Sequence, residues 1–158
     1  MTTDPENTII METTKGRVVI ALRPDLAPNH VARIKELARA GFYDGIVFHR
    51  VIDGFMAQAG CPYGTGTGGS DLPDLPAEFS KTPFERGTVG MARSQSPNSA
   101  NSQFFIMFDQ GSFLNGQYTV VGQVVSGMEF VDKIKKGKGG NGEVSDPDRM
   151  VKVTVGKK

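Results

Sequence analysis

The sequence predicts a mainly β fold, a closed eight-stranded antiparallel β-barrel capped by two α-helices. Its 158 residues include 20 glycines and 9 prolines, which separate many short apolar segments, as in proteins whose strands are joined by tight connections. Only two segments have helical spacing, too few to cover both faces of a parallel sheet. An antiparallel sheet rolled into a barrel leaves the fewest open edges. The length suits a single domain over residues 1–158.

The chain is predicted to begin with a β-hairpin and a helix. Residues 8–13 and 17–22 are rich in β-branched side chains, and the intervening residues 14–16 end in a glycine that suits a turn. Pro28 favours the first position of a helix, and Gly41 suits the residue just after its end. Between them, apolar residues recur at helical spacing, at Val31, Ile34, Leu37 and Ala38.

The remaining segments predict strands, one long connection and a second helix. Strand patterns occur at residues 46–52, shortly after Gly54, and at 88–92, 103–108, 118–125 and 150–155. Residues 61–79 form a turn-rich connection, and connections of that length commonly carry function. The second helix is indicated by Met128, Val131 and Ile134, with lysines near its end and Gly137 after it. The total is about eight strands and two helices.

Composition makes several classes of protein improbable. Lys and Arg number 18 against 17 for Asp and Glu, a net charge of +1, so neither nucleic acid nor a membrane is an expected partner. The single cysteine, Cys61, cannot form an internal disulfide and is expected to be inert. No signal-like segment and no run of about 18 apolar residues is present, which predicts a cytoplasmic protein. The near-neutral charge favours a monomer.

Few residues offer nucleophilic or metal chemistry. The chain has two histidines, His30 and His49, and lacks HExxH, CxxC and GxSxG patterns, so metal sites and catalytic triads are disfavoured and no cofactor is expected. His30 is expected on the surface of the first helix. The run GTGTGG at residues 64–69 lacks the GK[ST] ending of a phosphate loop. We therefore interpret it as a flexible wall.

The segment FHRVIDGFMAQAG, residues 48–60, concentrates a cation, an amide and large apolar side chains. This segment resembles the signature of the cyclophilin-type peptidyl-prolyl cis-trans isomerases, in the form found in bacterial members. The resemblance continues in the order of that family through GTGGS (66–70), TVGMAR (88–93), SANSQFFI (99–106), FLNG (113–116) and VVGQVVSGMEFVDKI (120–134). It implies an eight-stranded barrel with two helices and a shallow outer groove that binds Xaa-Pro segments.

The resemblance assigns roles to individual residues. Arg50 corresponds to the catalytic arginine of the family, while Gln58 and Gln103 correspond to the polar edge of its proline pocket. Ala92 and Arg93 match the segment that pairs with the bound peptide backbone. The apolar proline pocket itself is assigned to Phe55, Met56, Phe105 and Leu114.

Two residues of the implied groove differ from many eukaryotic cyclophilins. Phe113 stands where those proteins have tryptophan, and Tyr118 where they have histidine. Losing the indole N–H removes a hydrogen-bond donor but keeps an aromatic wall. The sequence therefore predicts weak binding of cyclosporin, the macrocyclic inhibitor of the family.

Prolyl isomerisation can be catalysed by the few functional groups that this sequence offers. A prolyl bond isomerises in roughly 10–100 s, so a turnover of about 10 per second requires only about 3–4 kcal/mol of barrier reduction. One preorganised hydrogen-bond donor can supply that amount. Arg50 remains charged at any working pH, and Gln58 is expected to orient it.

Other interpretations of the same residues remain open. An arginine on a strand is usually a surface group, and neighbours such as Phe55 and Met56 usually enter the core. Strict alternation would separate that pair unless a bulge or a strand end lies near Gly54. Alternation also predicts that one of Phe104 and Phe105 points inward and the other toward the groove, and the resemblance selects Phe105 for the groove. The chain is thus predicted to be an isomerase that acts on proline-containing polypeptides and assists protein folding. The alternative is a proline-segment binding module with little turnover.

Overall fold

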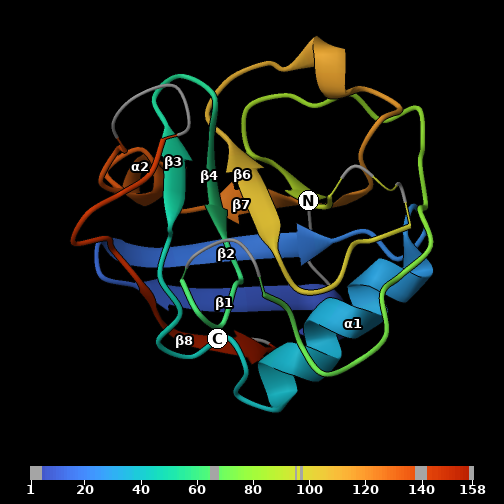
Figure 1. Ribbon diagram of the computed structural model, residues 1–158, viewed down its shortest axis with the longest axis horizontal. Coiled ribbons are helices and arrows are strands. Elements are labelled where there is room, and N and C mark those ends of the chain that lie inside the picture. Colours follow the sequence, from blue (N-terminus) through green and yellow to red (C-terminus); the bar gives the residue numbers. More distant parts are fainter. Residues whose placement is uncertain (1–4, 65–67, 95, 97, 138–141, 157–158) are drawn as a thin grey trace.

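A computed structural model describes residues 5–64, 68–94, 96, 98–137 and 142–156. Its strands form one antiparallel sheet in the order β3-β4-β6-β5-β7-β2-β1-β8. Figure 1 shows this sheet curled so that β3 and β4 run across the direction of β1 and β2. The strands are β1 Thr8–Thr13, β2 Gly16–Leu22, β3 Arg50–Ile52, β4 Met56–Ala59, β5 Thr88–Met91, β6 Phe104–Met107, β7 Val120–Ser126 and β8 Met150–Val155.

The two edges of the sheet meet through isolated bridges. Val47 bridges Arg149, and Arg50 bridges Glu143, both antiparallel. The Phe48 amide also donates to the Asp148 carbonyl at 2.8 Å. Because these bonds use backbone groups that an open edge would leave unpaired, the sheet curls on itself into a barrel-like form. The mainly β, eight-stranded antiparallel fold with two helices is confirmed.

Helix α1, Pro28–Arg39, agrees with the predicted helix, and Pro28 occupies its first turn. Helix α2, Met128–Val131, is shorter than the repeat to Ile134 predicted. The chain beyond it tightens, because the Lys133 and Ile134 amides donate to carbonyls three residues back, a spacing typical of a 3₁₀ turn. The helices lie toward opposite ends of the curled sheet (Figure 1). None of the helices described is long and apolar enough to cross a bilayer.

Two apolar clusters occupy opposite faces of the sheet. The large interior cluster contains Phe104 and Ile106, whereas Phe105 and Met107 belong to a smaller cluster on the outer face. This alternation along β6 confirms the predicted orientations of Phe104 and Phe105. The outer cluster also includes Met56, Phe84, Leu114 and Val120. A surface site thus rests on a packed apolar layer.

The expectation that His30 lies on the surface is wrong, because the residue is fully buried. His30 precedes Ile34 by one helical turn and therefore shares the inward face of α1. Its backbone amide donates to Glu78 Oε1 at 2.9 Å, and its ring Nδ1 contacts the same oxygen. Glu78 lies 48 residues further along the chain. The sequence around the helix therefore gave no sign of this partner.

Candidate functional site

Arg50 lies at one end of a chain of side-chain hydrogen bonds. It pairs with Gln58 across β3 and β4, and its Nη1 donates to Gln58 Oε1 at 3.1 Å. Gln58 Nε2 in turn donates to Gln103 Oε1 at 2.8 Å, and Gln103 Nε2 donates to the Gly68 carbonyl at 2.9 Å. These bonds restrict the orientation of the guanidinium, as the sequence predicts for Gln58.

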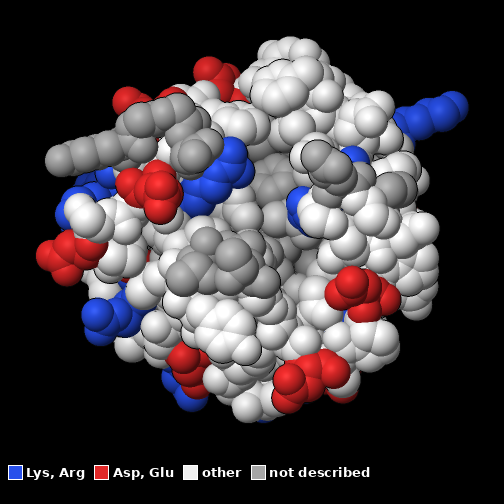
Figure 2. All heavy atoms as spheres, in the orientation of Figure 1, with Lys and Arg blue, Asp and Glu red and all other residues white. Residues whose placement is uncertain are grey.

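A surface cavity of about 290 Å³ brings together all but one of the predicted site residues. The exception, Gln103, lines a neighbouring cavity. Figure 2 shows the face that contains β3, β4 and β6, hollowed near its centre with basic side chains on either side. The first cavity, hereafter called the proline cavity after the substrate that the resemblance implies, is lined by Arg50, Phe55, Met56, Gln58, Ala92, Arg93, Phe105, Phe113, Leu114 and Tyr118.

The floor of the proline cavity is apolar and tightly packed. Phe105 is only 5% exposed; its ring stacks on Phe84 at 5.7 Å and meets the edge of Tyr118 at 5.8 Å. Gly90 lies below these rings, and a Cβ there would come within 2.6 Å of Phe84 and 2.8 Å of Phe105. Only glycine allows this close approach, because real Cβ atoms avoid contacts of that length.

The rim carries an aromatic pair outside the strands. Phe55 lies in the turn between β3 and β4, where Gly54 has φ 76°, a left-handed conformation that glycine adopts without strain. The turn frees Phe55 from strand alternation, so Phe55 and Met56 line one cavity. The Phe55 and Phe113 rings lie 5.4 Å apart, and Phe113 remains 69% exposed.

Arg93 forms the opposite side of the rim. Its guanidinium carbon lies 4.5 Å from the centre of the Tyr118 ring, a cation–π arrangement. Its Nη2 donates to the Gln117 carbonyl at 2.7 Å, and its Nη1 donates to the Ser94 carbonyl at 2.9 Å. The Arg93 cation is therefore directed toward Tyr118. The following segment includes residues 95 and 97, which lie outside the described residues.

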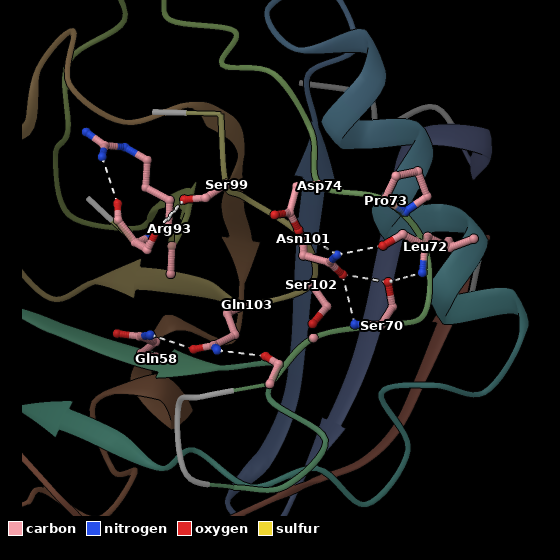
Figure 3. Close-up of a pocket in the computed structure, with 14 residues that line it drawn as sticks. Gln58, Ser70, Leu72, Pro73, Asp74, Arg93, Ser99, Asn101, Ser102 and Gln103 are labelled. Atoms are coloured by element: carbon pink, nitrogen blue, oxygen red, sulfur yellow. Dashed lines mark hydrogen bonds between the residues drawn. The ribbon is translucent and has the colours of Figure 1, made fainter. Parts of the chain in front are cut away.

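A second, larger cavity of about 640 Å³, hereafter the flanking cavity, adjoins the first. The two share Gln58, Ala92 and Arg93. Figure 3 shows its polar lining, in which hydrogen bonds radiate from Asn101. The other lining residues are Gly68, Gly69, Ser70, Leu72, Pro73, Asp74, Ser94, Ser99, Ser102 and Gln103. Thr65, Gly66 and Thr67 of the predicted flexible wall lie outside the described residues.

Sequence reasoning missed Ser70 and Asn101 as site residues. Both occur in the motifs GTGGS and SANSQFFI, but neither polar side chain suggests a partner on its own. In the structure, Asn101 Oδ1 accepts hydrogen bonds from the Ser70 backbone amide at 2.8 Å and from the Ser70 hydroxyl.

The described residues include no group of three or more His, Cys, Asp or Glu side chains placed to bind a metal ion.

His49, beside Arg50, is buried, and both burial and the positive charge of Arg50 lower its pKa from 6.5. In the unfolded chain the ring takes up a proton as the pH falls below 6.5, whereas the folded protein resists protonation. The His49 contribution to stability is therefore fully present above that pH and is lost as the pH falls toward the folded pKa.

We expect the free energy of unfolding to decline more steeply with falling pH in the wild type than in His49→Gln. The measurement is urea denaturation at several values from about pH 7.5 to about pH 5. Parallel curves for the two proteins would show that His49 titrates alike in the folded and unfolded states.

Comparison with known proteins identifies the family. Residues 8–155 match the family model described as "Cyclophilin type peptidyl-prolyl cis-trans isomerase/CLD". The match spans nearly the whole chain, including every residue of the proline cavity. The chain belongs to the cyclophilin-type peptidyl-prolyl cis-trans isomerases.

Individual relatives support the activity and the fold. A Brucella suis protein named "Probable peptidyl-prolyl cis-trans isomerase" is 65% identical over 96% of this chain and 84% of its own length. The cyclophilin AquaCyp293 from Hirschia baltica has a crystal structure with a TM-score of 0.88 and 31% identity, covering 98% of this chain and 76% of that one. The chain is thus a peptidyl-prolyl isomerase with bacterial relatives.

Proposed function

We propose that the enzyme binds proline-containing polypeptide segments in the proline cavity and that Arg50 is its catalytic residue. The observation that carries this proposal is that the Arg50 guanidinium, bonded to Gln58, and an apolar aromatic floor line the same cavity of about 290 Å³, whereas the Arg93 guanidinium lies against Tyr118. A Cryptosporidium parvum cyclophilin, 26% identical with a TM-score of 0.87, covering 96% of this chain and 99% of that one, was crystallised "in the presence of dipeptide ala-pro". That ligand has the chemistry this cavity fits.

The mechanism follows from the electronic structure of the prolyl bond. In the planar ground state, resonance delocalises the nitrogen lone pair. As the bond twists, the prolyl nitrogen recovers that lone pair and becomes a hydrogen-bond acceptor. Arg50 donates to it and stabilises the twisted state more than the planar one. Phe105 and Leu114 hold the proline ring and exclude water, while the preceding residue rotates.

Gln58 is the proposed positioning residue for Arg50. Its carboxamide oxygen accepts from Arg50 Nη1 at 3.1 Å, while its NH₂ group donates to Gln103. Because both ends of the amide are used, the oxygen faces the guanidinium. This bond restricts the orientation of the guanidinium in the cavity that Arg50 lines. No cofactor enters this mechanism.

A protease-coupled assay on a peptide with one Xaa-Pro bond tests the proposal. The wild type is expected to accelerate isomerisation, and an NMR titration with an uncleaved peptide is expected to shift signals from proline-cavity residues. Binding at this cavity without acceleration would support the alternative, a proline-segment binding module with little turnover. Acceleration without shifts at the proline cavity would place the active site elsewhere.

Cyclosporin inhibition tests the role of Phe113, the most exposed member of the cavity. The wild type lacks an indole donor at this position, so Phe113→Trp is expected to lower the inhibitory concentration about tenfold, the equivalent of one added hydrogen bond. Phe79→Trp is the matched control, because Phe79 is an exposed phenylalanine, 43% accessible, outside the cavity lining. Equal inhibition of the wild type and Phe113→Trp would contradict the prediction.

A further inference from the structure

We infer that Arg33 of helix α1 is a positioning residue that controls affinity for the substrate residues flanking the Xaa-Pro bond. The inference rests on the proposed function and extends it to the flanking cavity. Arg33 does not line either cavity. It acts from behind the wall, by fixing the chain segments that line the flanking cavity.

Arg33 is a buried cation held by backbone carbonyls. Its side chain is on the inward face of α1, and the residue is only 6% exposed. Its Nη2 donates to the Pro73 carbonyl at 2.6 Å, and its Nη1 donates to the Asn101 carbonyl at 3.3 Å. Both acceptors belong to residues that line the flanking cavity. A buried guanidinium is costly unless such bonds satisfy it, so this geometry is strongly constrained.

Asn101 extends the same support to the rest of the wall. Its Nδ2 donates to the Leu72 carbonyl at 2.8 Å and to Asp74 Oδ1 at 3.1 Å, while its Oδ1 accepts from Ser70. Figure 3 shows these bonds converging on the Asn101 side chain from the segment that carries Ser70, Leu72 and Asp74. Arg33 holds both the backbone of Asn101 and the wall that Asn101 organises.

A second anchor fixes the far end of this wall to the same helix. The Glu78 carboxylate accepts from the Asn29 amide at 3.3 Å and the His30 amide at 2.9 Å. The Glu78 amide donates to Thr119 Oγ1 at 3.0 Å, next to Tyr118 of the proline cavity. Helix α1 thus holds this segment at Pro73 and at Glu78. Between these two points, Leu75 pairs with Ala100 in a single isolated bridge and in no longer strand ladder.

The two cavities therefore have separate supports. The proline cavity is built on the ladder between β4 and β6, where Gln58 pairs with Phe105. One wall of the flanking cavity is tied to α1 by the bonds from Arg33. The two cavities meet at Gln58, Ala92 and Arg93. An extended peptide held at its proline can continue into the flanking cavity. Loosening the wall should weaken the flanking contacts and leave the proline site intact.

The experiment compares three capped peptides: a short Xaa-Pro peptide, one extended by three residues before it, and one extended by three residues after it. For each peptide, an NMR titration with the enzyme gives the Kd. Exchange between the cis and trans peptide signals gives the isomerisation rate when the enzyme is saturated with peptide. Arg33→Met removes both donors with similar bulk. It is expected to raise the Kd of at least one extended peptide about 5–10-fold, with less than about a twofold change for the short peptide and for the saturated rate.

Conservative and control variants separate positioning from general damage. Arg33→Lys keeps the charge and a donor group but not the planar fork that reaches both carbonyls, so it should recover part of the affinity, leaving a loss of about 2–3-fold. Arg39→Met is the control, because Arg39 lies on the same helix but pairs with Glu6 at 2.9 Å, away from both cavities. It should alter no Kd. Should Arg33→Met fail to fold, Arg33→Gln must show the same dependence on peptide length.

The outcomes distinguish this inference from the proposed function. Equal weakening of short and extended peptides, or no weakening of any, would overturn the role of Arg33. Equal wild-type Kd values for all three peptides would also overturn it, because the flanking cavity would then contribute no affinity. If the wild type isomerises none of the peptides, the proposed function itself fails.

Discussion

Replacing Arg50 with alanine is expected to lower kcat/KM for prolyl isomerisation about 100- to 1000-fold. Removing one preorganised donor from an oxyanion hole has effects of this size, and the barrier reduction required here is also about 3–4 kcal/mol. The loss should fall mainly on kcat, because the donor acts on the twisted nitrogen and not on the planar substrate. A protease-coupled assay with varied substrate concentration measures both constants.

Two further variants sharpen the test of Arg50. Arg50→Lys keeps a positive charge but loses the planar fork that bonds Gln58 and, in the proposed mechanism, also the substrate, so most of the loss should remain. Arg17→Ala removes an exposed arginine that pairs with Glu12 at 2.7 Å and should leave kcat/KM unchanged. A loss below about tenfold for Arg50→Ala would show that desolvation and binding, not this donor, lower the barrier.

Local patterns in the sequence predict the strands, whereas the groove follows from the resemblance to the family. Alternation predicts that Phe104 and Phe105 point to opposite faces, and the resemblance to the family assigns Phe105 to the groove. Gly54 favours a bulge or a strand end, and the structure has a turn there that releases Phe55 from alternation. The positions of Arg50 and Gln58 came from the motif, and the strand pairing explains why they touch.

The features that were missed depend on distant partners. His30 was expected at the surface, since nothing near it in the sequence reveals that Glu78 caps its helix from 48 residues away. The wall of the flanking cavity depends on Arg33 and Asn101, which are 68 residues apart. Helix α2 ends early because i to i−3 bonds replace α-helical ones, a choice that apolar spacing does not encode. Every residue has a backbone carbonyl, so residue types do not reveal which carbonyls accept these hydrogen bonds.

Replacing Phe105 with alanine is expected to damage both the stability and the substrate affinity of the enzyme. Phe105 is 5% exposed and contacts Phe84 and Tyr118, so truncation opens a void below the proline cavity. Buried phenylalanine to alanine changes cost about 3–5 kcal/mol of unfolding free energy. The widened floor also no longer grips the proline ring, and KM should rise at least about tenfold. Urea denaturation and the isomerase assay measure the two effects.

Phe84→Ala separates these two consequences. Phe84 is fully buried and stacks on Phe105 from below, but it does not line the cavity. Its truncation should lower the free energy of unfolding by about 3–5 kcal/mol, as for Phe105→Ala. KM should rise by less than about threefold, because the surface expected to contact the proline ring is retained. Phe105→Leu provides a folded, milder variant if alanine is not tolerated. If Phe84→Ala raised KM as much as Phe105→Ala, loss of rigidity and not loss of contact with the proline ring would explain the weaker binding.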